Sequence, residues 1–123
     1  MSWFHRKRVG HGDTDPKYYV YLLYIVQNGH EVPLYAGKGS GNRVTNHEKN
    51  LRNKLKKGYR LDSKERLMLL AEDLGYQIMW RIVESGLTED EAFNLENETI
   101  MSLGLLQRGN VAYPHRLVKV QVA

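Results

Sequence analysis

Glu96 occupies a position that packing alone does not explain. In the helix expected between Thr88 and Gly104, a turn of 100° per residue places Glu96 near the centre of an apolar stripe, while Glu98 points elsewhere. The stripe consists of Ala92, Leu95, Thr99, Ile100 and Leu103. A carboxylate there is costly unless it is paired, protonated or bound to a metal. Two interpretations stay open: a Glu hydrogen-bonded to a neighbouring strand, and a metal ligand or catalytic acid/base.

Arg43 and His47 are four residues apart, so in a helix they share one face. A guanidinium can clamp phosphate oxygens, and an imidazole can accept or donate a proton near neutrality. Such pairs also occur on ordinary helices, so this pair alone does not identify a site.

Tyrosine is frequent, with eight copies in 123 residues, and Tyr19, Tyr21 and Tyr35 fall on two expected strands. These phenols either pack in the core with a hydrogen-bonded hydroxyl or belong to a site. The glycine-rich stretch 37–41 lacks the Gly-Lys-Ser/Thr ending of a phosphate-binding P-loop, so nucleotide hydrolysis is excluded. The chain shows neither zinc-ligand spacing nor a Gly-x-Ser-x-Gly motif.

Basic residues are concentrated in one segment. Between Arg43 and Arg60 there are seven Lys or Arg and a single acid, Glu48. A basic face of this kind suits the phosphates of nucleic acid, although a solvated helix surface is the open alternative. If the segment binds nucleic acid, the residues expected to contact phosphates are Lys38, Lys49, Arg52, Lys54, Lys56 and Lys57.

The pattern of hydrophobic residues predicts the strands and helices that must position these side chains. A strand buried on both faces is expected at 18–26, and a turn at Asn28-Gly29 leads to a second strand at 32–36. Glycines 37–41 predict a tight backbone turn. Helices are expected at 42–57, with Val44, Leu51 and Leu55 on the apolar side, and from the Asp62/Glu65 capping box to Gly75.

The remaining elements follow the same logic. Residues 76–84 alternate, which predicts a third strand with Ile78, Trp80 and Ile82 on one side. A Thr88/Glu91 capping box opens the last helix, and residues 117–122 are expected to form a short edge strand. We therefore expect a polar and basic N-terminal arm at 1–17 and a single α/β domain at 18–123, with a three-stranded, mainly antiparallel sheet flanked by helices.

Composition limits the class of protein further. The chain has 18 Lys and Arg, 14 Asp and Glu, and no Cys, which excludes disulfides, thiolate zinc sites and a cysteine nucleophile. The longest apolar run, 18–26, is too short to span a bilayer, and the first residues lack a signal-peptide pattern. A cytoplasmic or nucleoid-associated protein without a membrane partner is expected, and a homodimer is left open.

Taken in order, Tyr19-Val20-Tyr21, Tyr35-Ala36-Gly37, Arg43, His47 and Glu96 resemble the GIY-YIG endonuclease superfamily. The stretch 35–44 is similar to the branch that includes LEM-domain ankyrin-repeat nucleases and small bacterial or phage relatives. Glu91 to Glu96 resembles the glutamate helix of the family, and Asn110 matches its C-terminal asparagine. The resemblance covers residues 18–111, and Tyr19 and Ala36 depart from the family triplets.

The resemblance implies a metal-dependent DNA endonuclease with low intrinsic sequence specificity, acting on duplex or branched DNA. Glu96 would bind Mg²⁺ or Mn²⁺. Arg43 would stabilise the scissile phosphate, and Tyr21 or Tyr35 would position or deprotonate the water, with His47 as the alternative or assisting base. Gly37 and Asn110 would have supporting roles.

This mechanism carries two further expectations. A tyrosine is a poor base unless a neighbouring cation lowers its pKa, which Arg43, Lys38 or a metal would have to do. Arg43 and His47 are also expected to be exposed together in one concave site with Tyr21 and Tyr35. The alternative function is a catalytically inactive nucleic-acid-binding module of the same fold, and a third is a small basic RNA-associated protein.

Overall fold

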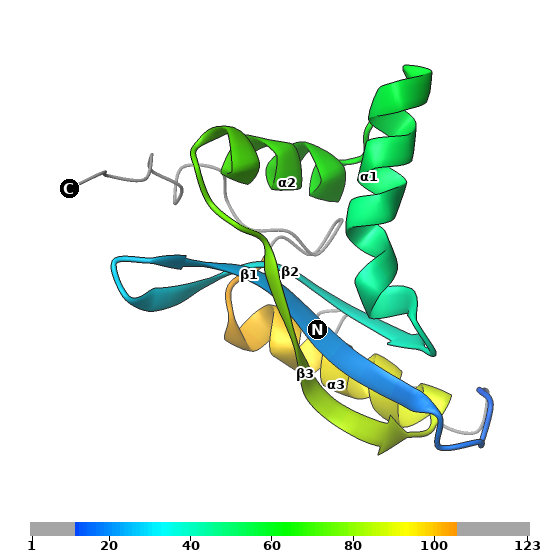
Figure 1. The fold of residues 1–123 in the computed structure, drawn as a ribbon. Helices are drawn as coiled ribbons and strands as arrows, with labels where there is room; N and C mark the ends of the chain where they lie inside the picture. The colour runs from blue at the N-terminus through cyan, green and yellow to red at the C-terminus, as the bar shows by residue number, and fades with distance from the viewer. Residues whose placement is uncertain (1–11, 106–123) are drawn as a thin grey trace, which may run out of the picture.

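A three-stranded antiparallel sheet forms the middle of the computed structural model, which describes residues 12–105 (Figure 1). The strand order is β2-β1-β3, with β1 (Tyr18–Gln27) between β2 (His30–Ser40) and β3 (Met79–Leu87). Helix α3 (Glu89–Ser102) covers one face of the sheet, and α1 (Asn46–Lys57) and α2 (Ser63–Asp73) lie on the other side. The expected α/β architecture is confirmed.

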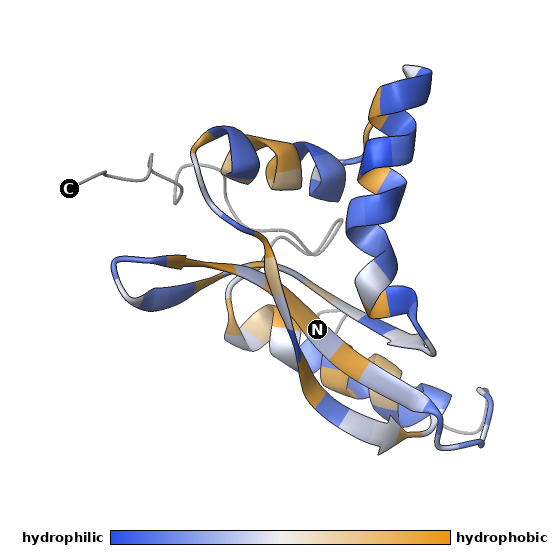
Figure 2. Cartoon of the chain, in the orientation of Figure 1, coloured by the Kyte–Doolittle hydropathy of each residue, from blue (hydrophilic) through white to orange (hydrophobic). Residues whose placement is uncertain are grey.

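The central strand is buried on both faces, as its sequence predicts. Tyr19, Tyr21 and Leu23 pack with residues of α1 and α2 on one face. Val20 packs with Leu87 and α3 on the other. Figure 2 shows the apolar run of β1 beside the almost wholly hydrophilic surface of α1. The two neighbouring strands satisfy the backbone of β1, so its side chains are held in fixed positions.

The β1–β2 hairpin closes through Asn28 and Gly29 alone. Their φ angles are 54° and 77°, and Gln27 pairs with His30 across the turn. Two consecutive residues with positive φ give the turn whose twist matches that of an antiparallel pair. The turn predicted from Asn-Gly is confirmed.

The glycine-rich segment is not the tight turn that we expected. Residues 37–40 continue β2 and pair with β1, in the register Tyr21↔Gly37 to Tyr18↔Ser40. The chain turns only at Gly41, whose φ is 60°. The physical reason is packing: the missing side chains at 37 and 39 leave room for the side chains of Tyr21 and Arg43.

The first helix begins later than predicted. Residues 43–45 form a short 3-10 turn, and α1 starts at Asn46 and ends at Gly58, whose φ of 71° gives a left-handed C-cap. Val44 and Leu51 are buried, but Leu55 is 42% exposed because it lies beyond the contact with the sheet.

The two capping boxes are both confirmed. The Asp62 side chain accepts from the Glu65 N–H and the Glu65 carboxylate accepts from the Asp62 N–H, which opens α2. Thr88 and Glu91 do the same for α3.

The third strand is an edge strand with a more exposed surface than its alternation suggested. It begins at Met79, and Trp80 and Ile82 are 49% and 37% exposed. Both residues pair with the central strand, but neither belongs to the buried core clusters.

The predicted N-terminal arm is described only from Gly12 onward. There, Asp13 exchanges hydrogen bonds with Glu89 at the start of α3. The remainder of the arm, Asn110 and the expected strand at 117–122 lie outside the described residues. Among the described residues, the model contains no helix long and apolar enough to cross a membrane.

Candidate active site

Tyr21 and His47 form a hydrogen-bonded pair inside the protein. The Tyr21 hydroxyl lies 2.5 Å from Nε2 of His47, and the ring centroids are 5.4 Å apart. Tyr21 is completely buried and His47 is 7% exposed. The expectation that His47 is exposed together with Arg43 is therefore wrong, because the first turn of α1 directs its imidazole toward the sheet.

Tyr35 on β2 completes an aromatic cluster around this pair. Its ring centroid lies 6.1 Å from that of Tyr21 and 5.6 Å from that of His47. Tyr35 is only half-buried, so of the two phenols it is the one that retains access to solvent.

Gly37 and Gly39 allow side chains to cross β2 at close range. A Cβ atom at position 37 would lie 2.6 Å from the Tyr21 hydroxyl oxygen, and one at position 39 would lie 2.6 Å from Cδ of Arg43. The exposed Arg43 thus lies against the glycine segment, where its positive charge acts on Tyr21, Tyr35 and Glu96.

Tyr19 fixes the turn that carries Arg43. Its hydroxyl donates to the Gly41 carbonyl at 2.8 Å and accepts from the Val44 N–H at 3.1 Å. Both partners flank Arg43 in the sequence, so Tyr19 of the central strand fixes the backbone from which the Arg43 side chain extends.

Glu96 reaches the same region from α3. Burial raises the pKa of its carboxyl group, and the charge and backbone N–H of Lys38, together with the charge of Arg43, oppose that increase. Because β2 is an edge strand, its outer backbone groups are open to such a side-chain partner. Glu98 is exposed, so the predicted helix phase is confirmed.

Burial sets the protonation states of the cluster. It raises the pKa of Tyr21 far above the usual range, with a further increase from Tyr35, and the neighbouring Arg43 only partly opposes this shift. Burial, with the charges of Lys64 and Arg43, lowers the pKa of His47 to about 4. Near neutral pH the phenol is protonated and the imidazole is neutral. In this structure Arg43 does not make Tyr21 acidic, contrary to what the sequence argument required.

Burial and neighbouring charges also shift the pKa values of Tyr35 and Glu96. Burial raises the pKa of Tyr35, and the negative charge of Glu96 adds to the increase. Burial also raises the pKa of Glu96, while Lys38 and Arg43 lower it. Positive charge bound beside Glu96 would favour the ionised form of both groups.

A metal could be held here by one carboxylate and not by a protein cage. Within residues 12–105, the structure contains no group of three or more His, Asp or Glu arranged to ligate an ion. Mg²⁺ commonly uses one or two carboxylates, with waters and substrate phosphates as its other ligands. Glu96 as the single carboxylate is compatible with that mode.

The six residues assigned to DNA contacts fall into two groups. Arg52 forms ion pairs with Glu72 and Glu48, and Lys54 binds the buried Glu65 at 2.7 Å, so both have structural partners. The others are not held in ion pairs within the described residues; they are Lys38, Lys49, Lys56 and Lys57.

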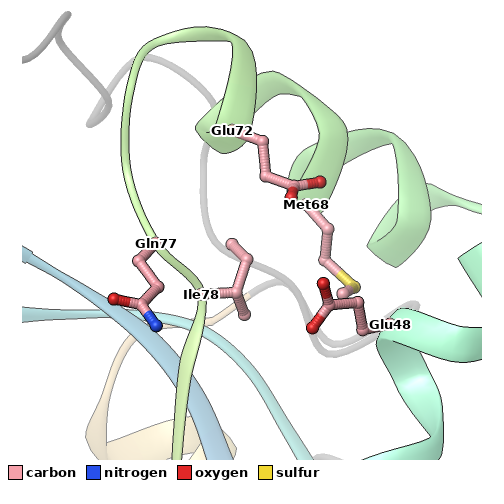
Figure 3. Close-up of a pocket in the computed structure, with 5 residues that line it drawn as sticks. All are labelled: Glu48, Met68, Glu72, Gln77 and Ile78. Carbon is pink, nitrogen blue, oxygen red and sulfur yellow. The ribbon is translucent and has the colours of Figure 1, made fainter.

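A small hollow of about 110 Å³ lies between α1, α2 and the segment before β3 (Figure 3). Glu48 and Glu72 contribute carboxylates to its wall, together with Met68, Gln77 and Ile78. Two carboxylates repel phosphate, so we do not include this hollow in the candidate site.

Lys64 is a site residue that the sequence argument missed. Its ammonium nitrogen lies 5.3 Å from the centre of the Tyr35 ring, its side chain is 19% exposed, and its charge lowers the pKa of His47. Lys64 follows the cap of α2 by two residues, and only the packing of that helix brings it to β2. No spacing within the sequence indicates this contact.

Searches against protein-family models, curated proteins and solved structures found no match to this chain.

Proposed function

We propose that this protein is a metal-dependent endonuclease of the GIY-YIG type that hydrolyses DNA phosphodiester bonds with low sequence specificity. The supporting observation is that five polar or ionisable side chains, far apart in the sequence, lie close together in the fold. Side chains from five separate elements gather where β2 passes between α1 and α3: Tyr21, Tyr35, Arg43, His47 and Glu96. An ordinary core has no need to bring these polar groups together.

Arg43 is the exposed cation of the cluster and is suited to bind the scissile phosphate. Its charge would offset the negative charge that develops on the phosphate oxygens during attack. Tyr35 is the half-buried phenol that can hold the attacking water. The fully buried Tyr21 acts as a positioning residue that orients His47 and Tyr35 through its hydrogen bond and ring contacts.

The neutral imidazole of His47 is the final proton acceptor in this scheme. Because it is buried, the proton would reach it by relay: Tyr21 gives its hydroxyl proton to Nε2 and takes up the proton of the water held at Tyr35. Its low pKa results from burial and from the nearby cations Lys64 and Arg43. A bound phosphate would offset the two cations and so raise the pKa of His47, while burial, the larger cause, would continue to lower it. The imidazole would therefore become a better base when substrate is present.

Glu96 would hold the divalent ion, which when bound would supply positive charge to the phosphate and to the leaving oxygen. The Lys38 N–H orients the carboxylate, and the residual ligand positions would be filled by water and phosphate. Lys49 and Lys56 would contact flanking phosphates in a salt-dependent manner.

The alternative is a module of the same fold that binds DNA without cutting it. The observation that favours it is the burial of Tyr21 and His47, since buried groups cannot touch a substrate. Nicking of supercoiled plasmid separates the two functions. The endonuclease predicts nicking with Mg²⁺ or Mn²⁺ and none in EDTA, whereas the binding module predicts a gel shift without nicking.

Two substitutions test the roles, and a third is a matched control for the first. Glu96→Gln should abolish nicking and retain DNA binding, and the exposed Glu98→Gln on the same helix should cut normally. Arg43→Ala should also abolish nicking while weakening DNA binding only modestly. Full nicking by Glu96→Gln or Arg43→Ala would refute the assignment of that residue.

A further inference from the structure

A second polar groove opens on the protein beside the candidate active site. It has a volume of about 350 Å³ and is formed by α1, the segment that follows it and the start of α2. The lining residues are Asn50, Asn53, Lys54, Lys57, Tyr59, Asp62, Lys64 and Glu65. Of these residues, the roles proposed above use only Lys64.

One wall is a regular stripe along α1. Asn50, Asn53, Lys54 and Lys57 follow the spacing i, i+3, i+4, i+7, so they share a single helix face. Two of them carry amides, each with donors and an acceptor, and two carry ammonium groups. This combination can bond both to the edge of a base and to a phosphate.

Tyr59 supplies an aromatic surface at the rim. Its side chain is 62% exposed, and the ammonium nitrogen of Lys57 lies 5.8 Å from its ring centre. An exposed ring next to a cation is the arrangement on which an unpaired base can stack while its phosphate is neutralised.

The base of the groove is held firmly. Glu65 is 2% exposed, accepts from Lys54 at 2.7 Å and accepts from the Asp62 N–H at 2.9 Å. Asp62 in turn caps α2. Lys57 has no ion pair within the described residues and is the cation best placed to meet a ligand phosphate. Lys64 lies beside it at the groove wall, where its ammonium nitrogen is 3.9 Å from a carboxylate oxygen of Asp62.

Lys64 connects the groove to the candidate active site. It lines the groove, and its ammonium nitrogen also lies 5.3 Å from the Tyr35 ring centre. A strand whose scissile phosphate lies at Arg43 and Tyr35 could therefore continue past Lys64 into the groove.

We propose that this groove binds an unpaired nucleotide of a DNA strand, with its base on Tyr59, its phosphate at Lys57 and Lys64, and its base edge at Asn50 and Asn53. The inference deepens the proposed function, because it makes DNA with a single-stranded segment next to the cut the preferred substrate. A base within a duplex cannot occupy the groove, because its faces are already stacked.

Binding in EDTA tests the groove without cleavage. The probes are a fluorescently labelled oligothymidylate and a labelled blunt duplex of the same length. Tyr59→Ala should weaken oligothymidylate binding about 5- to 150-fold, the range found when a base-stacking aromatic is removed, and leave duplex binding unchanged. Tyr59→Phe should retain the affinity, because stacking needs the ring and not the hydroxyl.

Trp80→Ala is the matched control, since Trp80 is an exposed aromatic residue on the edge strand β3, 49% exposed. It should leave oligothymidylate binding intact. Asn53→Asp adds a negative charge to the groove and should weaken the same complex. Both variants, like Tyr59→Ala, change exposed positions, so circular dichroism should show an unchanged fold.

Three results would overturn the inference: unchanged oligothymidylate binding by Tyr59→Ala, an equal loss for the blunt duplex, or an equal loss in Trp80→Ala. The outcome is separable from that of the proposed function. If Tyr59→Ala loses oligothymidylate binding but the wild type never nicks DNA, the groove proposal stands and the nuclease proposal is refuted. If the wild type nicks DNA and Tyr59→Ala does not change oligothymidylate binding, the nuclease proposal stands and the groove proposal is refuted.

Discussion

A methyl group at position 37 has no room in this structure. In Gly37→Ala the new Cβ would lie 2.6 Å from the hydroxyl oxygen of Tyr21, 2.7 Å from its Cζ and 2.9 Å from Cε2 of Tyr35. Carbon atoms pack comfortably at about 3.5–4.0 Å, so one ring must move by about 1 Å. Tyr21 is fully buried and cannot move outward.

The cost of this substitution follows from two contributions. Overpacking of a well-packed core costs about 1–3 kcal/mol. Displacement of Tyr21 also weakens its hydrogen bond to His47, which adds about 1 kcal/mol. We therefore expect Gly37→Ala to lower the free energy of unfolding by about 2–4 kcal/mol, measured by urea denaturation followed by circular dichroism.

Gly39→Ala is the matched comparison on the same strand. Its Cβ would meet Arg43 at Cδ, Cγ and Cβ, at 2.6, 3.1 and 3.0 Å. Because that side chain is exposed, its Cγ and Cδ can swing away, whereas its Cβ needs a small shift of the turn. The cost should therefore be near the lower end of the range of about 1–3 kcal/mol. Gly39→Ala should thus keep most of its stability and lose plasmid nicking. Equal stability of Gly37→Ala and the wild type would refute the packing argument at position 37.

Three other perturbations have definite expected outcomes. Burial lowers the pKa of His47 to about 4, so as the pH falls from about 6.5 the unfolded chain protonates this imidazole before the folded protein does. The free energy of unfolding should therefore fall by about 1–3 kcal/mol between about pH 6.5 and about pH 4, and His47→Gln should flatten this pH dependence. Tyr19→Phe leaves the Val44 N–H and the Gly41 carbonyl without their partner, and denaturation should show a loss of about 1–2 kcal/mol. Lys56→Gln should reduce the slope of log binding constant against log salt by about 1 for duplex DNA, and an unchanged slope would remove Lys56 from the phosphate contacts.

Local chemistry made parts of this fold predictable. The Asn28-Gly29 turn and both capping boxes depend on residues within four positions of each other, so the sequence contains the whole interaction. The phase of α3 is equally local, and for this reason the position of Glu96 on the covered side, with Glu98 exposed, could be anticipated.

Tertiary contacts decided the features that could not be predicted. Residues 37–40 form a strand because Tyr21 and Arg43 fill the space above the glycines, and neither contact is visible from glycine content. The burial of His47 and the approach of Lys64 to Tyr35 depend in the same way on how α1 and α2 pack against the sheet. The residue types of the candidate site could be predicted from the sequence, but the protonation states of their side chains could not.

The two-residue turn of the β1–β2 hairpin has a consequence for engineering. Asn28 and Gly29 are exposed and lie seven and eight residues along their strands from Tyr21 and Gly37, which corresponds to about 23–26 Å at 3.3 Å per residue. A recognition module spliced into this tip would leave the strand register at Gly37 unchanged. If the proposed DNA binding holds and the hairpin follows a duplex that rises about 3.4 Å per base pair, such a module would read sequence about seven base pairs from a phosphate held beside Gly37.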